Sequence, residues 1–283
     1  MSRRFLALAS AAVLLVASPI AFAQTTLIHA GELLAVPGER PLRQQTIVVE
    51  ADQIVDVRAG FADAAEFGDD VTVINLRDAF VLPGLMDMHV HLQGQLGPNR
   101  YRDDLKMSPQ LVQMRSLMYA MRTLEAGFTT VRDVGSSAQE MYAMRDAINN
   151  GWIDGPRIIA AGGVGITGGH ADISGVQPDL MEHWTSPNVC DGPYDCRRAA
   201  RNVIKYGADL IKITSTGGVM TDRATGTGQQ MEADELREVV LAAERMGRKV
   251  ASHAHHEDGI VAALEAGVAS IEHGSYTCLL YTS

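Results

Sequence analysis

The chain has 283 residues, of which 46% are hydrophobic and 20% are charged, and its formal net charge is −10 at pH 7. This is an ordinary globular composition, and the length allows a large core and one domain the size of an α/β barrel. The acidic charge argues against nucleic acid or an anionic membrane as a partner.

Residues 1–23 have the pattern of a secretory signal peptide. They carry Arg3 and Arg4, then an apolar run, and they end in the small-residue pattern A-F-A before Gln24. We therefore expect cleavage before Gln24 and a periplasmic or secreted protein. Cleavage removes two arginines and no acidic residue, which moves the net charge from −10 to −12. A membrane anchor is the alternative, but this apolar run is short, and no later stretch is long enough to span a bilayer.

Residues 24–79 consist of short alternating segments, such as "TIVVEADQIVDVRAG", that are interrupted by glycine and proline. Alternation of this kind predicts a small β domain. From Phe80 the pattern changes, because apolar strands now alternate with helical stretches. We therefore place the start of a second domain at residue 80 and extend it to residue 275.

Helices in this second domain are predicted over residues 109–126, 138–149, 194–206, 233–246 and 258–266. Ser108 is the expected N-cap of the first, and each helix stops at a glycine before the next strand. Six strands separated by helices imply a parallel sheet with right-handed crossovers. Either a (β/α)8 barrel or a doubly wound open sheet fits this order, but no G-x-G-x-x-G motif follows the first strand.

The histidines favour the barrel. Six of the nine lie at or just beyond the carboxyl ends of predicted strands: His89, His91, His170, His253, His255 and His273. In a barrel those ends converge on one mouth, where active sites lie, whereas an open sheet would spread them along an edge. The other three, His29, His183 and His256, are interpreted as structural or solvated.

Four of these histidines are candidate metal ligands. His89 and His91 lie two residues apart, so in a strand both side chains point to the same face. His253 and His273, from the fifth and sixth strands, can converge on them. Neutral imidazole suits zinc and other divalent first-row metals. His255 shares a face with His253 and competes with it, and we prefer His253 because it lies closer to the strand.

Lys212 lies within an apolar strand, "DLIKITS". A charged, unpaired lysine there would cost several kcal/mol, and burial lowers the pKa of such an amine. The neutral amine can take up carbon dioxide and become a carbamate, whose two oxygens can bridge two cations. The alternative is an ion pair with a nearby acid.

The three cysteines are Cys190, Cys196 and Cys278. Export to an oxidising compartment favours a bridge between Cys190 and Cys196 across the loop "CDGPYDC", but two free thiols fit the sequence equally well. No C-x-x-C pair occurs, which argues against a cysteine-based zinc site.

Together, "GLMDMHVHL", "GADLIKITSTGGV" and "VASHAHHEDGIVAALEAGVASIEHGS" resemble the amidohydrolase superfamily. They are most similar to its binuclear branch, which includes Xaa-Pro dipeptidases, acyl-amino-acid hydrolases and ochratoxinase-type amidases. The resemblance covers Leu27 to Ser275. It implies a distorted (β/α)8 barrel with a small flanking β-sandwich, and two divalent metal ions, zinc by ligand preference. The implied metal ligands are His89, His91, carbamylated Lys212, His253 and His273.

We therefore expect hydrolysis of amide bonds in dipeptides or N-acyl amino acids by a metal-bridged hydroxide, with Lys212 as a catalytic residue. His170 is a candidate for contacting the substrate and stabilising its oxyanion, and His255 is a further candidate for substrate contact. Arg223 could hold a substrate carboxylate. The alternatives are loop-packing roles for His170 and Arg223, lactones or cyclic amides as substrates, and a periplasmic metal- or substrate-binding protein without turnover.

Six barrel strands are two fewer than the fold requires. The final "YTCLLYTS", residues 276–283, departs from the family, and we interpret it as a non-native tail on a truncated chain. The family places a proton-shuttling Asp on strand eight, which this sequence lacks, so we expect this chain alone to be inactive. The sequence leaves the oligomeric state open, a homo-oligomer included.

Overall fold

A computed structural model describes residues 24–98, 100–220 and 226–277, and the chain divides into two compact units between Pro83 and Gly84. The predicted signal peptide, Arg223 and Cys278 lie outside the described residues. Phe80 and Val81, which begin the second domain in the sequence analysis, form the end of a strand of the first unit.

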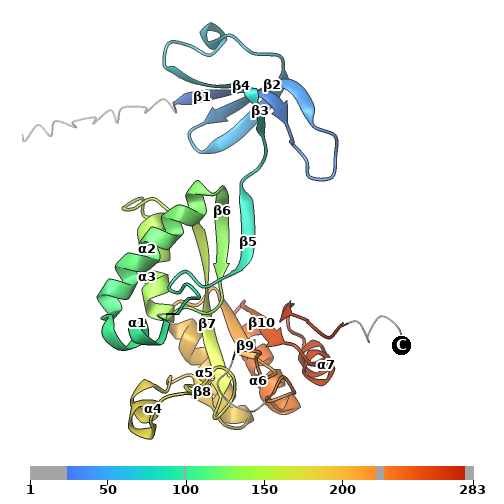
Figure 1. Cartoon of the computed structure of the whole chain (residues 1–283). Coiled ribbons are helices and arrows are strands. Elements are labelled where there is room, and N and C mark those ends of the chain that lie inside the picture. The colour runs from blue at the N-terminus through green and yellow to red at the C-terminus, as the bar shows by residue number, and fades with distance from the viewer. Residues whose placement is uncertain (1–23, 99, 221–225, 278–283) are drawn as a thin grey trace, which may run out of the picture. The chain divides into compact units, whose positions relative to one another are not determined.

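The first unit is a single four-stranded sheet with the strand order β3-β2-β1-β4 (Figure 1). Its elements are β1 (Thr25–Leu33), β2 (Leu42–Glu50), β3 (Gln53–Ala59), the 3-10 helix η1 (Ala64–Glu66) and β4 (Val71–Val81). β1 pairs antiparallel with β2 and parallel with β4, and β2 pairs antiparallel with β3. Ala30, Leu33 and Ile47 form its small core. The sequence predicts a β-sandwich here, and the described residues of this unit form this one sheet.

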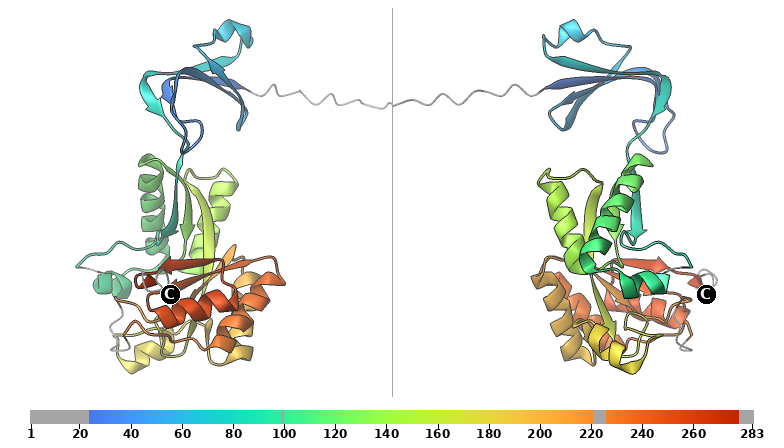
Figure 2. Two further views of the ribbon diagram at one scale, coloured as in Figure 1. Left: turned by 90° about the vertical axis from the view of Figure 1, so that its right-hand side faces the viewer. Right: turned by 60° about the vertical axis from the view of Figure 1, so that its left-hand side comes forward.

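The second unit contains six parallel strands in the order β11-β10-β9-β7-β6-β5, which curve into a nearly closed barrel (Figures 1 and 2). The strands are β5 (Leu85–Val90), β6 (Phe128–Asp133), β7 (Arg157–Ile166), β9 (Leu210–Thr214), β10 (Lys249–Ala254) and β11 (Ser270–His273), and the short β8 (Val189–Cys190) pairs with β7. The helices are α1 (Arg100–Lys106), α2 (Pro109–Glu125), α3 (Ala138–Asn149), α4 (Pro178–Trp184), α5 (Pro193–Lys205), α6 (Ala233–Glu244) and α7 (Glu257–Ala266). The barrel rather than the open sheet is therefore confirmed.

The predicted helices lie within two residues of the observed ones, and Ser108 caps α2 by accepting a hydrogen bond from the Leu111 amide. The two short helices, α1 and α4, were not predicted. Both are seven residues long, and neither has room for the repeated apolar spacing that identifies a helix in a sequence.

Strand alternation separates two apolar layers in this unit. Ile211 and Ile213 belong to the large core cluster that the strands share with the helices. Leu210 and Ala251 belong to a second, smaller cluster on the opposite face of the strands, which is the barrel interior. Because side chains two apart share a face, Lys212 on β9 and His253 on β10 also point into the barrel.

The Cys190–Cys196 disulfide, which the sequence left open, is present, with Cα atoms 4.9 Å apart. Both cysteines are buried. Cys190 belongs to β8, and its carbonyl oxygen accepts a hydrogen bond from the Thr167 amide, just after β7. The bridge thus ties the start of α5 to the loop that carries His170.

The burial of a leucine side chain in this unit predicts how much its replacement by alanine lowers the free energy of unfolding. Leu236 on α6 is fully buried, whereas Leu264 on α7 is 53% exposed. Leu236→Ala should lower the free energy of unfolding by about 2–5 kcal/mol, because it removes buried methyl groups and leaves a cavity. Leu264→Ala should change it by less than about 1 kcal/mol. Urea unfolding of both variants measures this, and equal losses would contradict the packing described.

Candidate metal centre

Five imidazoles gather at the carboxyl ends of the barrel strands, and His253 is at their centre. Its ring centroid lies 4.3 Å from that of His170, 4.6 Å from that of His255 and 4.5 Å from that of His273. The His89 ring joins this group at 4.8 Å from His273. Strands β5, β10 and β11 and the loop after β7 therefore supply one cluster.

His91 extends the cluster by one ring, with its centroid 5.5 Å from that of His89. It follows the last residue of β5 and is exposed. Its ring packs on Gly135, where a Cβ atom would come within 2.0 Å of the imidazole. At Gly218, a Cβ atom would likewise come within 2.2 Å of the His170 imidazole. Both glycines are therefore required by close approach to an imidazole.

Three of these side chains meet the geometric requirement for holding a cation together. One ring nitrogen from each of His253, His255 and His273 lies within 4.8 Å of the others. The structure thus brings together both His253 and His255, the two competing candidates from β10. His255 also bonds Ser275 Oγ through Nδ1, at 2.8 Å.

His273 reaches the cluster through an unusual backbone conformation. It has a φ of 74°, in the left-handed region that non-glycine residues rarely adopt. Glu272 pairs in register with His253, so its side chain already points into the barrel. Regular alternation would turn the next residue outward. The left-handed turn at His273 instead lets two consecutive residues serve the interior, and such strain typically accompanies function.

Burial keeps the imidazoles of His253 and His273 neutral. It lowers the pKa of His253 to about 2, and the nearby His170 and Lys212 act in the same direction. Burial also lowers the pKa of His273 to about 4, again with contributions from neighbouring cationic groups. Because a neutral ring nitrogen is what binds a metal, these histidines are prepared as ligands.

Lys212 is 7% exposed, and no hydrogen bond or ion pair joins its amine to another described residue. Burial lowers its pKa to about 8, although the charge of Glu272 opposes the change. The hydroxyl of Thr214, two residues further along the same face, is buried without a hydrogen-bond partner among the described residues. Among the residues that the structure describes, Lys212 therefore does not form the direct ion pair that was the alternative.

Three charged residues near the cluster, Arg132, Asp133 and Glu272, were not identified from the sequence. Glu272 bonds both His89 and Arg132. Asp133 is 2% exposed and accepts hydrogen bonds from the amides of Leu92 and Ser136, which ties the loop after β6 to the residue beyond His91. Arg132 and Asp133 end the apolar strand "FTTVRD", and charged residues at the end of a buried strand were the signal that could have revealed them.

The other predicted positions have ordinary surroundings. His29 lies in the first unit, where Nε2 contacts the Ala62 carbonyl oxygen. His183 is exposed on α4, and His256 precedes the first residue of α7. None of the three belongs to the cluster.

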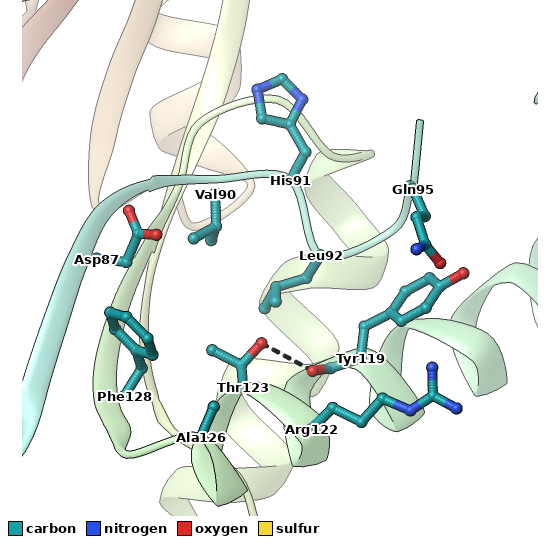
Figure 3. Close-up of a pocket in the computed structure, with 11 residues that line it drawn as sticks. Asp87, Val90, His91, Leu92, Gln95, Tyr119, Arg122, Thr123, Ala126 and Phe128 are labelled. Carbon is teal, nitrogen blue, oxygen red and sulfur yellow. Dashed lines mark hydrogen bonds between the residues drawn. The ribbon is translucent and has the colours of Figure 1, made fainter. Parts of the chain in front are cut away.

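A cavity of about 410 Å³ lies between the end of β5 and α2 (Figure 3). Its lining includes Leu92, Tyr119 and Phe128, and the figure shows the His91 imidazole pointing away from them. The cavity thus lies on the helix-facing side of β5, and His91 of the histidine cluster is among its lining residues.

Imidazoles at the carboxyl ends of parallel barrel strands, with a buried lysine within one of those strands, define the active-site end of a barrel enzyme. The sequence model of the amidohydrolase family matches residues 80–281, and the chain belongs to that family.

The relatives are consistent with this assignment. The chain is 33% identical over 269 residues to the ochratoxinase of Aspergillus niger, covering 90% of this chain and 55% of the relative. A crystal structure of a Xaa-Pro dipeptidase with methionine in its active site superimposes with a TM-score of 0.82 at 40% identity, over 88% of this chain and 61% of that one. The crystal structure of A. niger ochratoxinase gives 0.77 at 30% identity, over 90% of this chain and 61% of that one. The chain thus spans little more than half the length of these relatives.

The neutral state of buried His253 makes the stability of the metal-free protein depend on pH. The unfolded chain protonates this histidine near pH 6.5, whereas the folded state does so only near pH 2. Unfolding below pH 6.5 takes up a proton, so acid lowers the free energy of unfolding, by at most about 1.4 kcal/mol per pH unit from this residue. Chelator-treated protein unfolded in urea between pH 5 and 8 should show this slope.

His253→Gln should reduce that slope, because glutamine does not titrate. His183→Gln, at an exposed position on α4, is the matched control and should leave it unchanged. An unaltered slope in His253→Gln would show that His253 is protonated in the folded state.

Proposed function

We propose that the protein is an exported, metal-dependent hydrolase of amide bonds in dipeptides or N-acyl amino acids. The observation that carries this proposal is the convergence of neutral imidazoles beside Lys212 in a barrel of the amidohydrolase family. The names of two relatives, Xaa-Pro dipeptidase and ochratoxinase, support a small-molecule substrate with an amide bond. A prolidase at 29% identity, solved with N-methylphosphonate-L-proline, supports the dipeptide class.

The donor set fits two divalent metal ions, with zinc the first choice. His89, His91, Lys212, His253 and His273 would hold them, and His255 is the competing ligand from β10. The geometric fit of three imidazole nitrogens supports one ion, and the rings of His89 and His91 supply nitrogens for a second. Bound there, the pair would polarise the scissile carbonyl and supply hydroxide near neutral pH.

Lys212 would contribute as a carbamate. Its amine nitrogen bonds to the carbon of CO2 and releases one proton, which leaves an anion with two oxygens. The lowered pKa supports this reaction, because only the neutral amine reacts. Thr214 supports it as well. Its buried hydroxyl has no hydrogen-bond partner among the described residues, and a carbamate oxygen on the same face would accept from it.

His170 is our candidate for contacting the substrate. Its ring lies 4.3 Å from that of His253, and its backbone amide donates to Gln230 Oε1 at 2.8 Å, which holds the loop in place. Burial lowers its pKa, so the neutral ring can donate one hydrogen bond to a developing oxyanion. Arg223 remains a predicted carboxylate-binding residue, and His255 a second candidate for substrate contact.

The metal and lysine assignments are tested together. The full-length protein should bind two zinc ions per chain and lose turnover of N-acyl amino acids after chelation. Lys212→Ala should lower both the zinc content and the turnover. Losing an outer-shell partner typically costs roughly 10–100-fold, and the loss of this ligand should be larger. Lys212→Glu should restore part of each, because it returns a carboxylate.

Lys249→Ala, at an exposed position on β10, is the matched control and should behave as wild type. Wild-type turnover in Lys212→Ala would show that Lys212 is structural. A parallel assay with lactones separates the two substrate classes, and turnover of lactones alone would overturn the amide assignment.

Export has an independent test. Protein recovered from its host should begin at Gln24, because the A-F-A pattern before it fits signal cleavage. No helix in the described residues is long and apolar enough to cross a membrane. Mass spectrometry of the intact protein measures the mature N-terminus, and retention of residues 1–23 would contradict export.

A further inference from the structure

Glu272 is a buried carboxylate inside the barrel, 5% exposed, and its hydrogen-bonding partners among the described residues belong to barrel strands. Its Oε2 atom lies 2.8 Å from His89 Nδ1. Its Oε1 atom accepts from Arg132 Nη2 at 2.6 Å and from Ser270 Oγ at 2.7 Å. One carboxylate thus connects β5, β6 and β11.

The chemistry of these partners determines where the proton on His89 lies. An ionised carboxylate only accepts hydrogen bonds, and an arginine only donates them. Nδ1 of His89 must therefore carry the hydrogen that points at Glu272. In a neutral imidazole this leaves the lone pair on Nε2, the other ring nitrogen.

Arg132 holds the carboxylate and the His89 strand together. Its Nε atom donates to the carbonyl oxygen of Met88 at 2.6 Å, in the residue directly before His89. Its Nη2 atom donates to Glu272, and its Nη1 atom donates to Ser270 Oγ at 3.2 Å. The distance between the His89 backbone and the Glu272 carboxylate is therefore controlled by one rigid, planar group.

We propose that Glu272, clamped by Arg132, is a positioning residue that fixes His89 as the Nδ1–H tautomer and presents its Nε2 atom to a metal. This rests on the proposed function in assigning His89 as a ligand. A carboxylate that accepts the second ring N–H of a metal-binding histidine orients the ring and strengthens it as a ligand. The register of β11 turns Glu272 into the barrel, and the left-handed backbone at His273 lets the next residue face the same site.

Glu272→Gln makes a sharp test, because an amide has only one acceptor oxygen. Arg132 and Ser270 both donate, so that oxygen must face them, and the amide NH2 group must face His89. His89 would then accept at Nδ1 and carry its hydrogen on Nε2, the nitrogen required for the metal. We expect zinc affinity, measured by competition with a chromophoric chelator, to fall about 10–100-fold.

Glu235→Gln is the matched control, since Glu235 is also 5% exposed but caps α6. It should leave zinc affinity within about twofold of wild type. Long-range 15N–1H NMR of histidine-labelled, metal-free protein should show Nδ1–H for His89 in wild type and Nε2–H in Glu272→Gln. Unchanged affinity and tautomer in a folded Glu272→Gln protein would overturn the proposal.

Glu272→Asp is the second variant, for use if Glu272→Gln does not fold. It keeps the negative charge that faces Arg132 but shortens the side chain, so that the carboxylate reaches less far toward His89. We expect a near-native melting temperature with weakened zinc binding, and wild-type affinity would overturn the proposal. If wild type binds no zinc, the metal part of the proposed function fails. The NMR result then decides the tautomer separately, because it is read without metal.

Discussion

The parallel register of the barrel strands is the constraint on which this structure depends. Adjacent strands run the same way, so their carboxyl ends meet at one mouth, and alternate residues along each strand face one interior. In β9, β10 and β11 the register aligns Thr214 with His253 and His253 with Glu272. Residues more than 180 positions apart, such as His89 and Glu272, come within hydrogen-bonding distance as a result.

Placing polar groups in that interior has a physical cost, which the barrel meets by neutralisation and pairing. Burial keeps His253 neutral and brings the pKa of Lys212 to about 8. Glu272 is different. Burial alone would raise its pKa, but hydrogen bonds from Ser270 and His89 and the charge of Arg132 hold that pKa below its usual value. The interior thus contains one ionised pair beside the neutral imidazoles of His253 and His273, which is an arrangement suited to receiving a cation.

The close approaches around the cluster explain why small residues surround it. Gly135 and Gly218 lie where a side chain would collide with an imidazole, and His273 adopts a left-handed backbone to turn its ring inward. These features place rings at centroid separations of 4.3 to 5.5 Å, and that spacing is what the site requires.

The sequence by itself determined the order of strands and helices, the barrel, the family resemblance and the set of histidines and lysine at the strand ends. These follow from local information, because periodicity, caps and terminal glycines are set by neighbouring residues. Only the tertiary structure decided that Cys190 and Cys196 are bridged, that both His253 and His255 approach His273, and that Glu272 and Arg132 contact His89. Each of these depends on how strands and loops that are distant in the sequence lie beside one another, which the spacing of residues along the chain does not encode. A one-residue shift in strand pairing would turn every such side chain to the other face.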